Sequence, residues 1–326
     1  MKKVMLFTLL MLIITAQTLP AQGLLSLFGS SGNKKGIHVK FLEGDEDSKD
    51  EILLVTIKGV IQETDGEGGM PFKAEKDLFE TLKKDLEVAR KRGAVKAILL
   101  EINSPGGEVT ASDIVYQQIK KIQRDTKKPV VALIGTMGAS GAYYVACAAK
   151  KIMAHPTSII GSIGVLMQAL NLEEVAKKIG FKAVTLKSDM TPMKDVLSPF
   201  KELTEQEREM LMKIINSIYD RFVDIVSESR NLSREEVIKI ADGGIYTSAR
   251  AKEIGLIDEI GYREDAMAEV CKLAGIESAA LVKRVTKKGI SEILSEMSEM
   301  SSGVPALRSE LRKLFLQGGT PVMMFK

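Results

Sequence analysis

Short apolar runs alternate with helical patterns through the first half of the chain. Runs rich in β-branched residues predict strands at 52–57, 94–102, 129–134 and 152–154. Between them, residues 74–92 and 109–124 carry apolar side chains at helical spacing. Apolar strands separated by helices are typical of parallel strands buried on both faces. The pattern predicts an α/β fold with a mostly parallel sheet.

The later pattern is mainly helical. We expect helices at 172–179, 204–229, from 233 onward, within 248–273 and at 292–315, and a strand at 183–186. Thr204 with Glu207, and Ser233 with Glu236, form capping-box patterns at two of the helix starts. A tail at 318–326 ends the chain.

The N-terminus has the pattern of a targeting signal. Two lysines precede an apolar run at 4–16, and small residues follow up to Gly23. This predicts a signal peptide cut after Gly23 or, if the run is counted on to Leu19, an uncleaved membrane anchor. In either case we expect an exported, membrane-associated chain whose folded part lies on the extracytoplasmic side.

Composition narrows the function classes. Hydrophobic residues make up 45% and charged residues 27%, as in folded globular proteins, and the net charge of +3 does not favour nucleic-acid binding. The two cysteines, Cys147 and Cys271, form no CxxC or Cys/His spacing, so a thiol-built metal site is not expected. Two free thiols are favoured, although a disulfide between them stays open.

Two glycine-rich turns follow predicted strands. Pro105-Gly106-Gly107 precedes one helix, and Ser140 lies between Ala139 and Gly141 at the start of another. Freed backbone N–H groups at such turns can point at an anion, and glycine lets a substrate approach them. Ser140 is a candidate nucleophile; a simple helix N-cap is the alternative.

A serine nucleophile needs a base. His155 lies in a loop and His38 in a polar stretch, and neither is persuasive, although His155 stays open. Lysine is the other solution, and it must be neutral, so its pKa must fall from ~10.4 toward ~7–8. Lys194 has apolar neighbours and Lys187 lies close by, whereas most lysines are solvated surface residues. Asp195 would raise the pKa of Lys194 unless its carboxylate points away.

Six segments in order resemble the signal peptide peptidases of the SppA (protease IV) family, which share the Clp-protease/crotonase fold. They lie at 103–107, 137–146, 161–165, 194–200, 241–247 and 251–258. The similarity runs from about residue 52 to residue 274. It implies repeated ββα units with a mostly parallel sheet, and a division into 1–28 (signal peptide or anchor), 29–50 (polar linker), 51–285 (peptidase domain) and 286–326 (C-terminal helix and tail).

The resemblance also implies an activity and a site. It implies a serine endopeptidase, without metal or other cofactor, that hydrolyses remnant signal peptides and other extended apolar peptides at the membrane. The nucleophile falls on Ser140 and the general base on Lys194, the oxyanion hole falls on the N–H groups of Gly107 and Gly141, and Ser162 orients the lysine. Tyr143 and Tyr144 are interpreted as packing residues.

By the same resemblance the chain forms a ring of about eight subunits in which neighbouring protomers supply the serine and the lysine. Two other functions stay open. One is a crotonase-type acyl-CoA enzyme, which the shared fold allows. The other is a catalytically silent, membrane-tethered scaffold that binds peptides.

Overall fold

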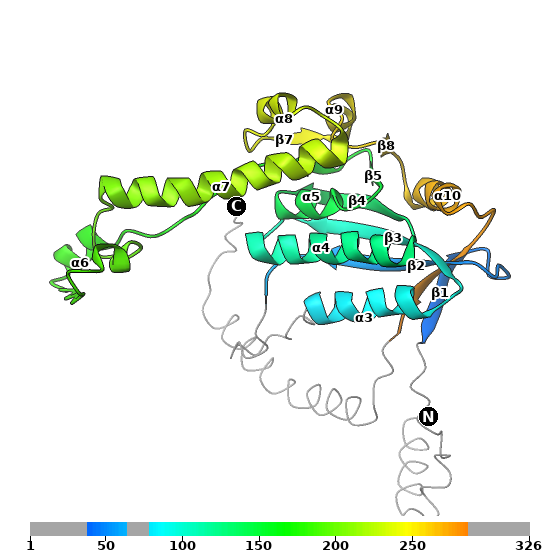
Figure 1. Ribbon diagram of the computed structural model, residues 1–326, viewed down its shortest axis with the longest axis horizontal. Coiled ribbons are helices and arrows are strands. Elements are labelled where there is room, and N and C mark those ends of the chain that lie inside the picture. The colour runs from blue at the N-terminus through cyan, green and yellow to red at the C-terminus, as the bar shows by residue number, and fades with distance from the viewer. Residues whose placement is uncertain (1–37, 64–77, 286–326) are drawn as a thin grey trace, which may run out of the picture. The chain divides into compact units, whose positions relative to one another are not determined.

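The computed structural model describes residues 38–63 and 78–285. The predicted N-terminal signal or anchor, the C-terminal helix and the tail lie outside these residues (Figure 1).

A nine-stranded, mostly parallel sheet forms the centre of the fold. Its main path runs in the order β1-β9-β2-β3-β4-β5-β8, with β6 paired to β4 and β7 paired to β6. Only the pairs β1–β9 and β6–β7 are antiparallel among the described strands. The strands are β1 (Val39–Gly44), β2 (Glu51–Lys58), β3 (Val95–Ser104), β4 (Val130–Ala139), β5 (Lys151–Ala154), β6 (Ile159–Gly161), β7 (Ile245–Thr247), β8 (Glu259–Ile260) and β9 (Ala280–Arg284).

Helices cover both faces of the sheet (Figure 1). Those on one face are α3 (Leu78–Lys91), α4 (Val109–Thr126) and α5 (Gly141–Ala146), and α10 (Arg263–Ala274) covers the other. Leu99 and Val131 pack with Ala266 and Val270 of α10. Because successive side chains of a strand point to opposite faces, the buried strand residues next to Leu99 and Val131 face α3, α4 and α5. Burial on both faces explains the unbroken apolar runs in the sequence.

The long helix α7 (Glu205–Arg230) begins at the capping box predicted from Thr204 and Glu207, and α8 (Arg234–Ile240) begins at the one predicted from Ser233 and Glu236. The C-terminal end of α7 is fixed by Arg230, which donates to Asp258 at 2.8 Å. The carboxylate of Asp258 also accepts from the N–H of Ile152 at 2.7 Å. This partly buried pair attaches α7 to the edge of the sheet beside α9 (Ser248–Glu253).

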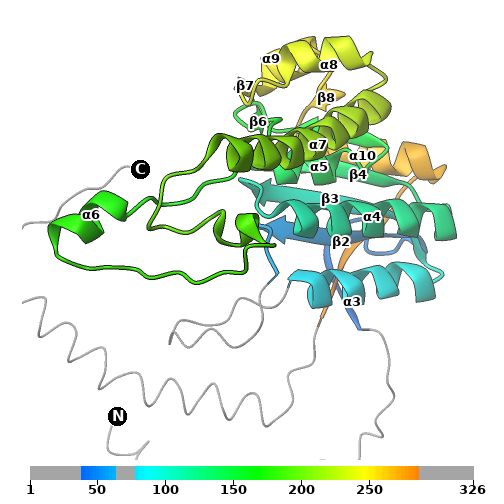
Figure 2. The same ribbon diagram turned by 60° about the vertical axis from the view of Figure 1, so that its left-hand side comes forward.

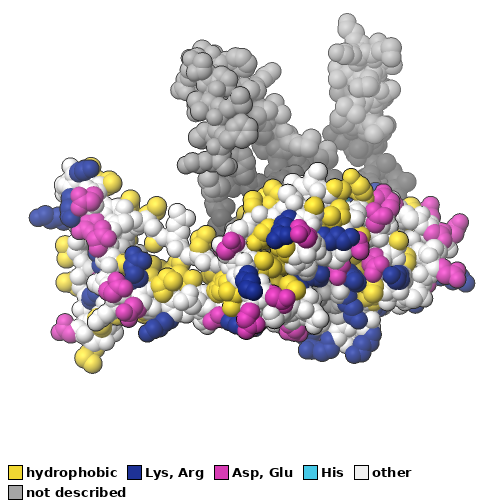
Figure 3. Space-filling model, turned by 90° about the horizontal axis from the view of Figure 1, so that it is seen from above, with side chains coloured by type: hydrophobic (Ala, Val, Ile, Leu, Met, Phe, Trp, Pro, Cys, Tyr) yellow, Lys and Arg dark blue, Asp and Glu magenta, His cyan; other side chains and the backbone are white. Residues whose placement is uncertain are grey.

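The opposite end of α7 carries an arm, defined here as residues 166–203, which lies away from the sheet (Figures 1 and 2). It contains α6 (Glu173–Lys178) and the 3₁₀ helix η1 (Pro192–Asp195). Hydrophobic side chains are exposed along it (Figure 3), among them Leu166, Leu170, Val184, Leu186 and Met190, the last three by 82%, 92% and 87%. Monomers rarely expose so many large apolar side chains in one region.

Three expectations from the sequence are corrected. Residues 39–44 belong to β1, which pairs with β9, so the polar linker expected at 29–50 ends before this strand. The strand expected at 129–134 extends to Ala139, because Gly138 pairs with Ser104 and residues 137–139 pair with β6. The strand expected at 183–186 is absent, and these residues are exposed on the arm.

Both cysteines are free thiols. Among the described residues, none of the helices has the length and apolar character required to cross a membrane.

Candidate active site

A cavity of about 480 Å³ opens where β4 and β6 end. Three of the residues singled out from the sequence, Gly107, Ser140 and Ser162, share its lining. The other lining residues are Val109, Gly164, Val165, Leu166, Tyr219, Ala241, Asp242 and Gly243. Segments far apart in the sequence therefore meet here, at the carboxyl ends of parallel strands, where α/β sheets commonly bind ligands.

Ser140 occupies a strained backbone conformation between β4 and α5. Its φ is 52° and its ψ is −125°, a region that side-chain-bearing residues rarely adopt. Its N–H donates to the carbonyl of Gly161 at 2.8 Å, which holds the turn against β6. The turn presents the Ser140 side chain to the cavity. Strain of this kind is common where a fold fixes a functional side chain.

The two glycine turns are in direct contact. A Cβ added to Gly106 would lie 2.7 Å from the N of Gly141 and 2.9 Å from the Cβ of Ser140. A Cβ added to Gly107 would lie 2.0 Å from the carbonyl oxygen of Ile61. No acceptor in the described chain engages the N–H of Gly107 or Gly141. Two free amides therefore lie beside Ser140, an arrangement able to bind an oxyanion.

The backbone of Ser162 is fixed in the same way as that of Ser140, by a hydrogen bond from its N–H to a glycine carbonyl. Its φ is also 52°, and its N–H donates to the carbonyl of Gly244 at 2.6 Å. The N–H of Gly244 donates in turn to the carboxylate of Asp242 at 2.8 Å. The adjacent residue Gly161 accepts from Ser140, so both serines of the cavity depend on the packing of β6.

Lys194 lies outside this cavity, in η1 on the exposed arm. The carboxylate of Asp195, the sequence neighbour of Lys194, accepts a hydrogen bond from Lys187 Nζ at 2.5 Å. His155 lines a different cavity of about 220 Å³ and packs against Tyr262 in a tilted arrangement, with ring centroids 5.4 Å apart. The described chain therefore brings Ser140, Ser162, Gly107 and Gly141 together and leaves the candidate base apart.

Comparisons with known proteins identify a family. The model of peptidase family S49 matches residues 122–277. A Methanocaldococcus jannaschii protein assigned as a protease is 34% identical over 325 residues, which cover 94% of this chain and 100% of that protein. An Enterococcus faecium protein assigned as a signal peptide peptidase SppA is 34% identical over 72% of this chain and 67% of its own length. The chloroplastic serine protease SPPA of Arabidopsis thaliana is 30% identical over 81% of this chain and 38% of its own length.

The chain belongs to peptidase family S49. The resemblance to SppA and the mixed α/β fold with a mostly parallel sheet are thereby confirmed, and the chain is a serine-type peptidase. The matched residues of this S49 peptidase include Ser140, Ser162 and Lys194, whereas Gly107 precedes them.

The sequence did not reveal a second, mainly apolar cavity of about 30 Å³ next to Ser140 in the S49 peptidase. It is lined by Ser140 and Gly141 together with Gly107, Val109, Ser112, Tyr144, Gly164, Val165, Ile218 and Phe222. Ile218 and Phe222 lie on α7, where helical spacing predicts only a core-facing stripe. Their place beside Ser140 follows from tertiary packing, which no local pattern shows.

The two tyrosines after Ser140 pack as expected. Tyr143 is fully buried and donates to the carbonyl of Leu256 at 2.6 Å. Tyr144 packs on Phe222 and donates to Asp113 at 2.6 Å. Burial, followed by the hydrogen bond to Asp113, raises the pKa of Tyr144 well above its ordinary value. Burial also raises the pKa of the Cys147 thiol to about 12, so this cysteine stays protonated at neutral pH.

The strain at Ser140 predicts an unusual order of stabilities. The free energy of unfolding of Ser140→Gly should exceed that of Ser140→Ala by about 1 kcal/mol, because glycine adopts this conformation without steric cost. Urea-induced unfolding of both variants measures the difference. Ser217, an exposed residue within α7, is the control: there the alanine variant should be the more stable. The same order at both positions would contradict strain at Ser140.

Proposed function

We propose that this S49 peptidase is an endopeptidase that cleaves signal peptides and other extended apolar peptides, with Ser140 as nucleophile and Lys194 of a neighbouring protomer as general base. One observation carries the proposal: Ser140 is held in a strained turn beside two free glycine amides, in a cavity shared with Ser162. This is the set of groups that acyl transfer to a serine requires, apart from the base.

The reaction follows from these groups. Neutral Lys194 accepts the Ser140 hydroxyl proton as Oγ attacks the peptide carbonyl carbon. The N–H groups of Gly107 and Gly141 donate to the oxyanion, and the protonated Lys194 then gives its proton to the leaving amine. Water, deprotonated by the same lysine, hydrolyses the ester on Ser140 and restores the enzyme. Ser162, with its backbone fixed by Gly244, is placed to orient the incoming lysine.

The position of Lys194 supports a site shared between protomers. Lys194 is exposed on the arm and does not line the cavity that Ser140 lines. The arm also exposes large apolar side chains, including Leu170 and Ile179, which a neighbouring copy would cover. A head-to-tail contact of this kind can close into a ring, and from the resemblance to SppA we infer a ring of about eight copies. Isolated monomers are then inactive.

The small cavity beside Ser140 supports an apolar substrate. Its lining is mainly apolar, and its volume of about 30 Å³ suits a short side chain on the residue whose carbonyl is attacked, termed P1. The relative from Enterococcus faecium is named as a signal peptide peptidase. The N-terminal signal or anchor inferred from the sequence would place the enzyme on the extracytoplasmic side of the membrane, where such peptides are released.

Loss of either proposed catalytic group should abolish cleavage. Ser140→Ala and Lys194→Ala should each lower kcat for a fluorogenic apolar peptide by about 10³-fold or more. Steady-state kinetics of the purified full-length chain in detergent measure the effect. Lys182→Ala, which removes another exposed lysine of the arm, is the matched control and should keep wild-type activity. Full activity of Lys194→Ala would exclude this lysine as the base, and an inert wild type would favour a peptide-binding role.

The small cavity predicts a P1 preference that one substitution should change. Ile218 lines the cavity and is only half-buried, so Ile218→Ala enlarges it at little cost to the core. We expect kcat/KM for a leucine at P1, relative to alanine, to rise about 10-fold. Ile214→Ala, at an exposed position one turn earlier on α7, should leave the ratio unchanged. An unchanged ratio in Ile218→Ala would show that P1 binds elsewhere.

A further inference from the structure

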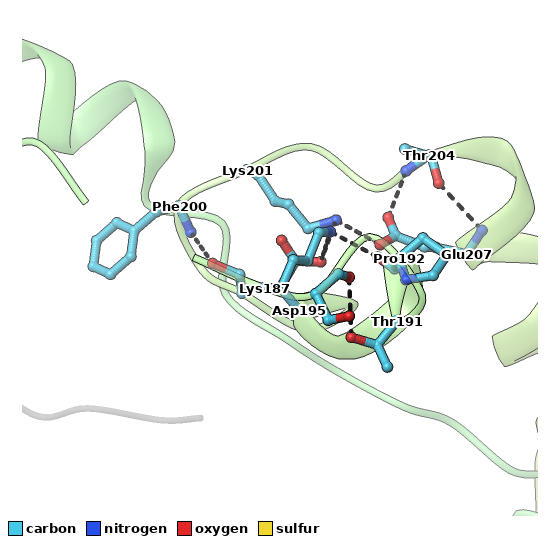
Figure 4. Close-up of polar contacts among 10 residues, drawn as sticks. Lys187, Thr191, Pro192, Asp195, Phe200, Lys201, Thr204 and Glu207 are labelled. Atoms are coloured by element: carbon cyan, nitrogen blue, oxygen red, sulfur yellow. Dashed lines mark hydrogen bonds and ion pairs between the residues drawn. The ribbon is translucent and has the colours of Figure 1, made fainter. Parts of the chain in front are cut away.

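A chain of four alternating charges surrounds the short helix that carries Lys194. Lys187 Nζ lies 2.5 Å from Asp195, and Lys201 Nζ lies 3.5 Å from the same carboxylate oxygen (Figure 4). Lys201 also pairs with Glu207 at 2.5 Å. Two ammonium groups thus face two carboxylates, and the group is electrically balanced.

Lys187 holds both ends of η1. Besides pairing with Asp195, the last residue of η1, its ammonium donates to the carbonyl of Pro192, the first residue, at 2.6 Å. Lys194 lies between these two points, and its N–H donates to the carbonyl of Thr191 at 3.1 Å. The backbone that carries Lys194 is therefore fixed from outside by one side chain.

The chain of charges continues into α7. The side chain of Glu207 is only 3% exposed, and its carboxylate accepts from the N–H of Thr204 at 3.0 Å as part of the capping box. Lys201 joins this cap to Asp195. The turn that bears Lys194 is thereby connected to the helix that lines the cavity beside Ser140 (Figure 4).

We propose that Lys187 and Asp195 are positioning residues, whose balanced ion pair orients Lys194 and sets the pH range in which it accepts a proton. The inference rests on the proposed role of Lys194 as base. Asp195 is adjacent in the sequence, and a free carboxylate there would favour the charged form of Lys194, which cannot act as a base. Lys187 engages this carboxylate instead, and its hydrogen bond holds the pKa of Asp195 below its ordinary value.

Removing one charge at a time should therefore have opposite effects. Asp195→Asn leaves the positive charge of Lys187 unbalanced near Lys194, which favours the neutral lysine. Lys187→Met leaves the Asp195 carboxylate less balanced, which favours the protonated lysine. The remaining ionisable groups of the arm lie on α6 or on its loops, and all are exposed except the half-buried Glu173: Glu173, Glu174, Lys177, Lys178, Lys182, Asp189 and Glu202. Glu205 and Arg208, at the start of α7, are exposed as well.

The pH dependence of kcat/KM, measured on the full-length chain, tests the inference. Its acid limb should move to lower pH in Asp195→Asn and to higher pH in Lys187→Met, each by roughly 0.5–1 pH unit at low salt. The double variant should return toward the wild-type position. Because these charges are partly exposed, 1 M salt should reduce both displacements.

Asp189→Asn is the matched control, since Asp189 lies on the same arm and forms no ion pair within the described residues. Its acid limb should coincide with that of the wild type. If Asp195→Asn and Lys187→Met lower the rate without moving the acid limb, or move it in the same direction, the pair has only a structural role and the inference is wrong.

A second measurement separates this inference from the proposed function. Trace acetylation of Lys194 with acetic anhydride, followed by mass spectrometry across the pH range, reports its neutral fraction without requiring turnover. Labelling curves displaced in opposite directions support the ion pair, and coincident curves overturn it. If the wild-type protein has no peptidase activity, the proposed function is contradicted, whatever the labelling curves show.

Discussion

The contact between two glycine turns is the constraint on which the site depends. Adjacent parallel strands β3 and β4 end side by side, and the turns that follow them meet without room for a side chain at Gly106 or Gly107. Since no Cβ intervenes, the free amides of Gly107 and Gly141 can both lie beside Ser140. The positive φ of Ser140 is maintained by β6, whose Gly161 accepts the Ser140 N–H. A buried, rigid sheet can hold such strain because helices pack on both of its faces (Figure 1).

In the proposed mechanism, the chemistry is divided between this rigid sheet and the arm. The sheet carries Ser140, the proposed nucleophile, and the two amides, which must be held precisely relative to each other. The arm carries Lys194, the proposed base, together with the exposed apolar side chains that the proposal assigns to contact with a second copy. Under the proposal of a shared site, activity depends on assembly, and peptide cleavage begins only where protomers have come together. The ion pair of Lys187 and Asp195 gives the arm local order within a single chain.

Much of the fold could be predicted because its signals are local. The apolar runs of β2, β3 and β4 and the capping boxes of α7 and α8 appear in the sequence as they appear in the structure. β1 was missed because its polar, alternating residues gain their order from pairing with β9, more than 230 residues later. The strand predicted at 183–186 is wrong. Its apolar residues suggested a buried strand, but on the arm they are exposed and pair with no other strand.

The candidate site was predicted only in part, because only some of its residues lie in segments with a local sequence signal. Ser140, Gly107 and Ser162 lie in recognisable glycine-rich turns, and the structure places all three in one cavity. Tyr219 and Ile218 line the site only through tertiary packing, so their sequence context carries no signal. Asp242 lies in one of the six segments that resemble the family, but its place in the cavity also follows from tertiary packing. The direction of the Asp195 carboxylate could not be known either, because it depends on Lys187 and Lys201.

The central claim is that a neighbouring protomer completes the site, and mixed assemblies test it most directly. Ser140→Ala and Lys194→Ala chains are coexpressed in equal amounts, with different tags, and the mixed assemblies are purified. If serine and lysine come from different protomers, a site is complete when an intact Ser140 meets an intact Lys194, and about a quarter of wild-type activity should return. If both come from the same chain, the mixture should be as inactive as either variant alone, and the account of a shared site would be wrong.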